Sequence, residues 1–249
     1  MHRFHLPPES WDTSTLDRAE SHHCLNVLRL GGGEKIAVFD GCGREASGVI
    51  VSAAGRVVLK LSSATRSPAP PRAITLAQAV PKGKTMDLIV QKAVELGAAR
   101  VAPLLSDRTV VQLADDASEK KRGKWQDIAL EACKQCGQNH LPEITKPVSP
   151  KAFLDRGAGS ELLLIASLQP DARPLKPVLA DFVSQHRRLP LSVTVFVGPE
   201  GDFTPAEIAL AKSHGCLPIT LGPIILRTET AAIYCLSVLA HELFGPESG

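Results

Sequence analysis

Apolar and polar positions follow two different patterns on either side of a proline-rich segment, residues 67–71 (SPAPP). Before it, short apolar runs separated by glycine-containing turns predict strands over residues 34–40, 44–53 and 56–64. The sequence DGCG at residues 40–43 is typical of a hairpin turn, and one helix is expected over residues 17–28. The pattern therefore predicts a small β-barrel-like domain over residues 1–70.

After the segment, strand-like and helix-like stretches alternate. Apolar runs predict strands over residues 74–80, 100–105, 162–167, 193–197 and 218–221. Helical spacing appears over residues 84–96, 119–136, 176–186, 205–214 and 228–244. This alternation predicts an α/β domain over residues 72–249, with a mostly parallel sheet covered by helices on both faces. Ligands of such sheets bind beyond the carboxyl ends of the strands, so the loops after Ile165, Val197 and Leu221 are the expected binding loops.

Composition narrows the class of protein only a little. Hydrophobic residues make up 44% and charged residues 22% of the chain, which is ordinary for a globular protein, and the net charge of +2 does not select a partner. No apolar run is long enough to cross a bilayer, and the N-terminal residues lack the apolar core of a signal peptide. We therefore expect a cytoplasmic protein whose six cysteines are reduced thiols.

Three local motifs suggest chemistry. Gly83-Lys84-Thr85 resembles the end of a phosphate-binding loop, but that motif requires glycine where this chain has Gln78. Lys82 and Lys84 nevertheless precede a helix, where they are either phosphate contacts or solvated lysines.

Cys133, Cys136 and His140 have the spacing of metal ligands, but structural zinc needs four. We therefore expect buried or half-buried thiols and no metal. The basic run at residues 120–125 is either a contact for RNA phosphates or a charged helix face anchored by Trp125, and the second interpretation is favoured.

Two segments are harder to explain by folding alone. VGPEGDFT at residues 197–204 leaves a buried strand through glycines that let the backbone approach a ligand closely. A capping box formed by Thr204 and Glu207 accounts for the helix that follows but not for Glu200. LGPIILRTET at residues 221–230 places three apolar residues between polar ones, which suits the wall of an apolar pocket, and then Arg227 at a helix start.

With these two segments read, the chain resembles the RsmE-type methyltransferases of the SPOUT superfamily, which methylate N3 of a uridine in 16S ribosomal RNA. The resemblance extends over nearly the whole chain. It includes Arg3-Phe4-His5, the stretch from His23 to Leu30, and Phe39-Asp40-Gly41. It continues through PKGKTMDLIVQKAVELG at residues 81–97 and EACKQCGQNHLPEI at residues 131–144. The chain departs from the family pattern at Asp202, Ile224 and Gln138, where glycine, a basic residue and arginine are usual.

The resemblance implies a PUA-like RNA-binding β domain (residues 1–70), a SPOUT α/β methyltransferase domain with a C-terminal trefoil knot (residues 72–249), and a homodimer. It also implies S-adenosylmethionine as methyl donor, bound by Ile165, Ala166, Ser167, Leu168, Val197, Gly198, Pro199, Glu200, Gly201, Leu221, Gly222, Ile225, Leu226, Thr228 and Thr230. Arg227 is the expected catalytic residue, which either stabilises negative charge that develops on the uracil or contacts a phosphate. Glu200 is expected either to face the sulfonium or to accept a proton. The expected contacts to 16S ribosomal RNA, or to the small subunit that contains it, are Arg3, Arg29, Lys82 and Lys84.

Two other functions fit part of the same sequence. One is another SPOUT activity, such as 2′-O methylation of a ribose in transfer RNA. The other is a ribosome assembly factor that binds RNA without catalysis, which the departures at Ile224 and Asp202 favour. Donor binding and the identity of the methylated nucleoside distinguish the three.

Overall fold

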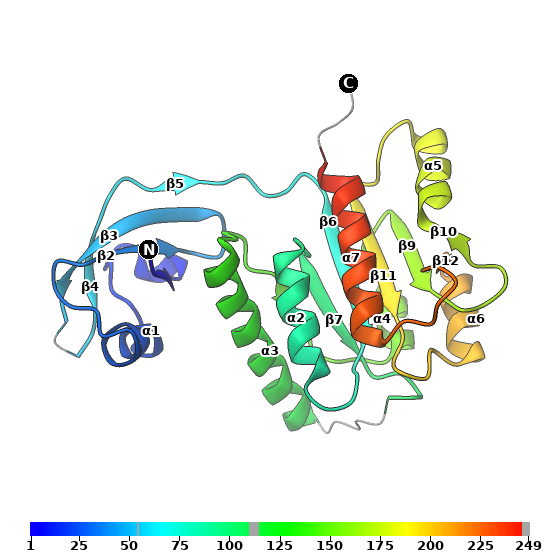
Figure 1. Cartoon of the computed structure of the whole chain (residues 1–249), viewed down its shortest axis with the longest axis horizontal. Coiled ribbons are helices and arrows are strands. Elements are labelled where there is room, and N and C mark those ends of the chain that lie inside the picture. Colours follow the sequence, from blue (N-terminus) through cyan, green and yellow to red (C-terminus); the bar gives the residue numbers. More distant parts are fainter. Residues whose placement is uncertain (54, 110–114, 246–249) are drawn as a thin grey trace. The chain divides into compact units, whose positions relative to one another are not determined.

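The computed structural model describes residues 1–53, 55–109 and 115–245. They divide into two compact units (Figure 1). The first comprises Met1–Ala69 and Leu130–Leu141, and the second comprises Pro70–Ala129 and Pro142–Gly249. The chain first changes units at the proline-rich segment, and residues 130–141 pack with the first unit. The domain bounds expected from the sequence stay a prediction.

The first unit is built on a β sheet. Its elements are β1 (Arg3–His5), a 3-10 turn (Pro8–Ser10), α1 (Arg18–His22), a π-helical turn (His23–Val27), β2 (Lys35–Phe39), β3 (Arg44–Ser52), β4 (Val58–Leu61) and β5 (Thr65–Arg66). Strands β1 to β4 lie in chain order, and β5 pairs with β3. The three predicted strands are present, and the single predicted helix is divided between α1 and the π-helical turn. Alternate residues such as Phe4, Ile36 and Val38 are buried in one apolar cluster.

Residues 130–141 are held against this sheet by two basic side chains. Arg3 stacks on the ring of Phe39, 4.0 Å from its centroid. Its Nη1 donates to the carbonyl oxygens of Cys133 (2.7 Å) and Gln138 (3.1 Å). Lys134 forms a buried ion pair with Glu20 of α1. These contacts give the physical reason why the segment belongs to the first unit.

The second unit is a parallel α/β domain. Its elements are β6 (Ala73–Ala79), α2 (Thr85–Glu95), β7 (Arg100–Leu104), α3 (Asp115–Cys136, whose last turns belong to the first unit), β8 (Glu143–Ile144), α4 (Pro150–Asp155), β9 (Leu162–Ala166), β10 (Arg173–Pro174), α5 (Leu175–His186), β11 (Ser192–Val197), α6 (Pro205–Ser213), β12 (Leu217–Thr220) and α7 (Thr228–Phe244). In the described residues the sheet has the order β10-β12-β9-β11-β6-β7-β8, and each neighbouring pair is parallel.

Helices cover both faces of this sheet. Ala77 and Phe196, which are paired in register, face a core that includes Leu154 of α4 and Ile208 of α6. The opposite face is covered by α7, which packs on β6, β11 and α2 (Figure 1). The predicted α/β layering is confirmed, while the trefoil knot stays a prediction. Within the described part of the chain, no helix combines the length and apolar character needed to span a membrane.

Candidate functional site

A pocket opens where three neighbouring strands end. Strands β12, β9 and β11 are adjacent and parallel, so their carboxyl ends share one edge of the sheet. The pocket encloses about 580 Å³ of space, a volume that includes the open solvent at its mouth. Its wall consists of Ala166, Ser167, Leu168, Val197, Gly198, Pro199, Glu200, Asp202, Leu221, Gly222, Ile224, Ile225, Leu226, Thr228 and Ala231.

The wall contains all but three of the expected donor-binding residues. Ile165 is buried inside β9 and packs in the core on the side of α4 and α6. Gly201 and Thr230 are exposed beside the pocket without lining it. Asp202, Ile224 and Ala231 line the pocket in addition. Each is adjacent in sequence to a residue of the predicted set, and this proximity could have identified them.

The loop after β12 presents an apolar lip at the pocket mouth. Ile224 and Ile225 are 73% and 77% exposed, although both are large apolar residues. Leu168, from the loop after β9, is also exposed and lines the same pocket. Exposing such side chains to water is unfavourable, and covering them with a flat apolar group recovers that free energy. The lip therefore suits an aromatic ring system.

The loop after β11 is shaped by close backbone packing. A Cβ atom on Gly198 would lie only 3.1 Å from the Cα of Asp202, so a side chain there would force the backbone of the turn to shift. Asp202 itself is left-handed (φ 60°), and its Oδ1 accepts a hydrogen bond from the amide of Phe203. Thr204 and Glu207 then form the predicted capping box at the start of α6. The turn is thus held at both ends.

Glu200 links this loop to the loop after β6. Its Oε1 accepts a hydrogen bond of 3.0 Å from the backbone amide of Lys82. The carboxylate lines the pocket, whereas the side chains of Lys82 and Lys84 are exposed. Glu200 is therefore placed at the rim and oriented by a neighbouring loop. The turn after β11 does not by itself require a glutamate at position 200. The hydrogen bond to Lys82 shows that Glu200 also holds the loop after β6.

Arg227 occupies the N-cap position of α7 in an extended conformation (φ −66°, ψ 154°) and is exposed. It adjoins the pocket through Leu226 and Thr228, which are its chain neighbours and line the wall. Thr228 is buried, and its Oγ1 donates to the carbonyl of Gly198 at 2.7 Å. Arg227 is thus a cation at the mouth whose guanidinium makes no hydrogen bond to another described residue, and Thr228 ties two walls together.

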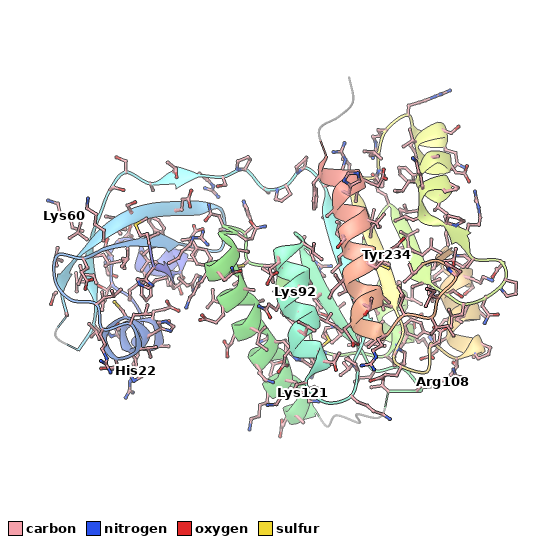
Figure 2. All side chains as sticks on the ribbon, in the orientation of Figure 1. His22, Lys60, Lys92, Arg108, Lys121 and Tyr234 are labelled. Carbon is pink, nitrogen blue, oxygen red and sulfur yellow. The ribbon has the colours of Figure 1, made fainter. Side chains whose placement is uncertain are left out.

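Arg108 is a cation at this rim that sequence reasoning missed. It follows β7, its Nη1 donates to the carbonyl of Gly201, and its side chain reaches the lower edge of the unit (Figure 2). The amide of Asp107 donates to Glu207 at 2.9 Å, which fixes the loop that carries Arg108. The carboxyl-end rule, applied to β7 as well, would have found it.

The two RNA contacts expected in the first unit, Arg29 and Arg3, differ in their exposure to solvent. Arg29 is exposed in a left-handed conformation (φ 57°). Arg3 has a side chain only 11% exposed, with its donors directed at Cys133, Gln138 and Asn139. Because its guanidinium is used inside the fold, we omit Arg3 from the RNA contacts proposed below.

The remaining motifs have structural explanations. Burial raises the pKa of Cys133 to about 12, and His140 Nε2 lies within hydrogen-bonding distance of the backbone oxygens of Ser67 and Pro68. Among the described residues, no group of three acidic, cysteine or histidine side chains could hold a metal. Trp125 is buried and donates to Asp87 through Nε1. The basic run is therefore a helix face anchored by a core tryptophan, as favoured above.

Comparison with known proteins adds to this geometry. A family model described as an RNA methyltransferase domain matches residues 68–240, and one described as an RNA methyltransferase PUA domain matches residues 16–61. Ribosomal RNA small subunit methyltransferase E of Bacillus subtilis is 31% identical over 238 residues, covering 94% of this chain and 92% of that protein. The corresponding protein of Synechocystis is 33% identical, covering 90% and 72%.

Two solved structures extend the similarity to the fold. A methyltransferase of Legionella pneumophila with bound S-adenosylmethionine is 35% identical, with a TM-score of 0.87 and coverage of 97% of this chain and 98% of that one. A ribosomal RNA small subunit methyltransferase E of Neisseria gonorrhoeae, also bound to S-adenosylmethionine, is 30% identical. Its TM-score is 0.84, with the same coverage of both chains.

Proposed function

Because this chain belongs to the RNA methyltransferase family that includes ribosomal RNA small subunit methyltransferase E, we propose that it transfers a methyl group from S-adenosylmethionine to N3 of a uridine in 16S ribosomal RNA. The observation that carries the proposal is the pocket formed at the ends of β9, β11 and β12. Relatives that have this fold over 97% of the chain are known with S-adenosylmethionine bound.

The residues of the pocket fit such a donor. Ile225 and Leu226 offer the apolar surface that an adenine ring requires, and backbone groups of the three loops are available for its polar edge and for the ribose. Gly222 has a left-handed backbone (φ 114°), which shapes the loop around the ligand without a side chain. We assign the adenosine to the side of the pocket formed by Gly222, Ile225 and Leu226.

When bound, S-adenosylmethionine supplies an electrophilic methyl group on a sulfonium. The uridine must lose its N3 proton to become the nucleophile, so the protein favours the reaction by orienting the base and stabilising its negative charge. Arg227, exposed at the start of α7, is the cation that we place next to the uracil oxygens or an adjoining phosphate. Glu200 has two roles open to it: facing the sulfonium, or accepting the N3 proton.

RNA is proposed to reach the pocket across a basic rim. Lys82, Lys84 and Arg108 follow the carboxyl ends of β6 and β7 and are exposed, and Arg29 is exposed in the first unit. Cations of this kind bind phosphates without reading sequence. The target base must leave its stack to reach a donor inside a pocket. Lys82, Lys84 and Arg108 would hold the flanking backbone while that occurs, and Arg29 would contact RNA from the first unit.

Methyl transfer from labelled S-adenosylmethionine to undermethylated 30S subunits tests the proposal, with the product nucleoside identified by mass spectrometry. We expect 3-methyluridine. A ribose-methylated nucleoside, or methylation confined to transfer RNA, would replace the proposal with another activity of the superfamily. Absence of both donor binding and methyl transfer would favour an assembly factor.

The same assay tests the side chains. Arg227→Ala is expected to lower kcat/KM by about two orders of magnitude, as removal of a group that stabilises developing charge usually does. Arg227→Lys keeps the charge and should recover part of the rate. If Arg227→Ala transfers methyl groups at the wild-type rate, Arg227 is not a catalytic residue. A pH–rate profile of Glu200→Gln separates the two roles of Glu200, because only loss of a base removes a titration from it.

We also propose a homodimer that acts in the cytoplasm, where its ribosomal substrate is found. Tyr234 is exposed and projects from the outer face of α7 (Figure 2), and we place the contact between protomers at this side chain. Light scattering of the purified protein should give twice the 26.5 kDa of one chain, and a monomeric mass would contradict the dimer.

A further inference from the structure

Gln78 is a fully buried amide at the end of a central strand of the second unit. Its Nε2 lies 2.8 Å from the carbonyl oxygen of Ala79, 2.9 Å from Thr228 Oγ1 and 3.5 Å from the carbonyl oxygen of Val197. Its Oε1 has no hydrogen-bond partner in the described residues. Burying an unsatisfied polar atom is unfavourable, so an amide kept in this core needs a role that an apolar residue would not perform.

The hydrogen bonds around Gln78 have a defined direction. Thr228 Oγ1 donates to the Gly198 carbonyl at 2.7 Å and has a single hydrogen, so it must accept from Gln78 Nε2. The opposite amide orientation is excluded, because it would turn Oε1 toward the carbonyl oxygens of Ala79 and Val197, which cannot donate. Gln78 therefore donates to Thr228, and Thr228 in turn donates to the carbonyl of Gly198.

This relay joins three segments that are distant in sequence. Gln78 is the penultimate residue of β6, Gly198 directly follows β11, and Thr228 begins α7. Gly198 and Thr228 line the pocket, whereas Gln78 does not touch it. The N-cap residue of α7 makes no side-chain capping hydrogen bond, so the Thr228 hydroxyl is the side-chain link between the first turn of α7 and the β11 loop.

We propose that Gln78 is a positioning residue for the methyl donor: acting through Thr228, it fixes the Gly198 carbonyl and the first turn of α7 in the arrangement that binds S-adenosylmethionine. This inference rests on the proposed function of the pocket. Without the relay, the two walls at Gly198 and Thr228 lose their common anchor. The donor must then order them on binding, which weakens its affinity.

Calorimetry with S-adenosylmethionine tests the relay in the full-length protein. Thr228→Val keeps the shape of the side chain and removes the hydroxyl, while Thr228→Ser keeps the hydroxyl. We expect Thr228→Val to raise the Kd by about tenfold, as loss of one hydrogen bond can, and Thr228→Ser to stay within about threefold of wild type. Gln78→Met, which keeps the volume and removes the donor, should match Thr228→Val.

A double variant shows whether the residues act together. If they form one relay, Gln78→Met combined with Thr228→Val should weaken donor binding no more than either change alone. Multiplied effects would mean that the two act separately. In Gln78→Met, the KM for S-adenosylmethionine should rise, with kcat at saturating donor and the KM for RNA unchanged. A merely structural role would not produce that selective change.

Thr194→Val is the matched control for stability. Thr194 lies in β11 and is buried, as Gln78 and Thr228 are. Its hydroxyl is 2.7 Å from Ser160 Oγ and takes no part in the relay. It should lower the melting temperature without changing the donor Kd. If Gln78→Met does not fold, the Thr228 pair still decides the matter. Wild-type Kd values in Thr228→Val would overturn the inference and leave the proposed function intact, whereas a wild-type protein that binds no donor would overturn both.

Discussion

Removing Arg3 should destabilise the first unit rather than weaken RNA binding directly. Its guanidinium donates to the carbonyls of Cys133 and Gln138 and to the side chain of Asn139, and it stacks on Phe39. A hydrogen bond to a charged group contributes about 1.5 to 3 kcal/mol, and a cation–π contact adds roughly 0.5 to 2 kcal/mol. Water will replace part of these interactions in Arg3→Ala. We therefore expect a loss of about 3 to 5 kcal/mol, as when one partner of a buried charged network is removed.

Tryptophan fluorescence can isolate this effect, because the chain has two tryptophans and only Trp11 lies in the first unit. Urea titration of Arg3→Ala in a Trp125→Phe background should show an early Trp11 transition. Arg29→Ala is the control, because Arg29 is exposed and should leave the transition unchanged while lowering affinity for RNA. Should Arg3→Ala unfold at the wild-type urea concentration and yet bind RNA poorly, our structural role for Arg3 is wrong and the original expectation of an RNA contact is right.

Three further predictions concern stability and reactivity. Burial lowers the pKa of His5 below its ordinary value of 6.5, so the unfolded chain takes up the proton first and stability should fall as pH drops below 6.5. Melting temperatures between about pH 7.5 and 5.5 will show this slope, and His5→Gln should reduce it. Glu207→Ala removes the capping box and the acceptor for Asp107, and should cost about 1 to 2 kcal/mol in urea unfolding. At pH about 8, iodoacetamide should modify exposed Cys42 and spare Cys133, whose pKa burial raises to about 12; equal labelling of both in the folded protein contradicts that assignment.

The elements of the second unit were predictable because their signals are local. Residues 84–96 carry apolar side chains at helical spacing, and Met86, Ile89, Val90, Ala93 and Val94 are all buried in α2 (Thr85–Glu95). Alternation of strands and helices then implies a parallel sheet, since each helix must return the chain to the same edge. The short elements β8, α4 and β10 were not predicted, because two to six residues are too few for a period to appear.

The division of α3 between the two units could not be read from periodicity. A helical pattern shows which side of a helix is apolar, but not which core that side meets. The contacts that assign residues 130–141 to the first unit come from Arg3 and Glu20, which are 130 and 114 residues away from their partners Cys133 and Lys134. No local pattern reports pairing over such a separation.

Gln78 shows a different limit within the site itself. In the sequence it counted as part of the predicted strand at residues 74–80 and as the residue that rules out a phosphate-binding loop, and neither observation gave it a role. Its burial follows from the register of β6 with β11, in which Gln78 pairs with Val197, and from α7 covering that face. Its role depends on two tertiary neighbours and was therefore outside the reach of any motif.

The pocket was easier to predict than the RNA contacts for a physical reason. Parallel strands necessarily end at a common edge, so topology alone brings their loops together. An arginine, in contrast, binds phosphate only if some of its donors remain exposed and unused, and this depends on what packs above it. Arg3 and His5 point to the same face of β1, away from the core residue Phe4, so the strand pattern leaves Arg3 in solvent. Residues 130–141 fill that space, and the same guanidinium that could have met RNA instead holds the unit together.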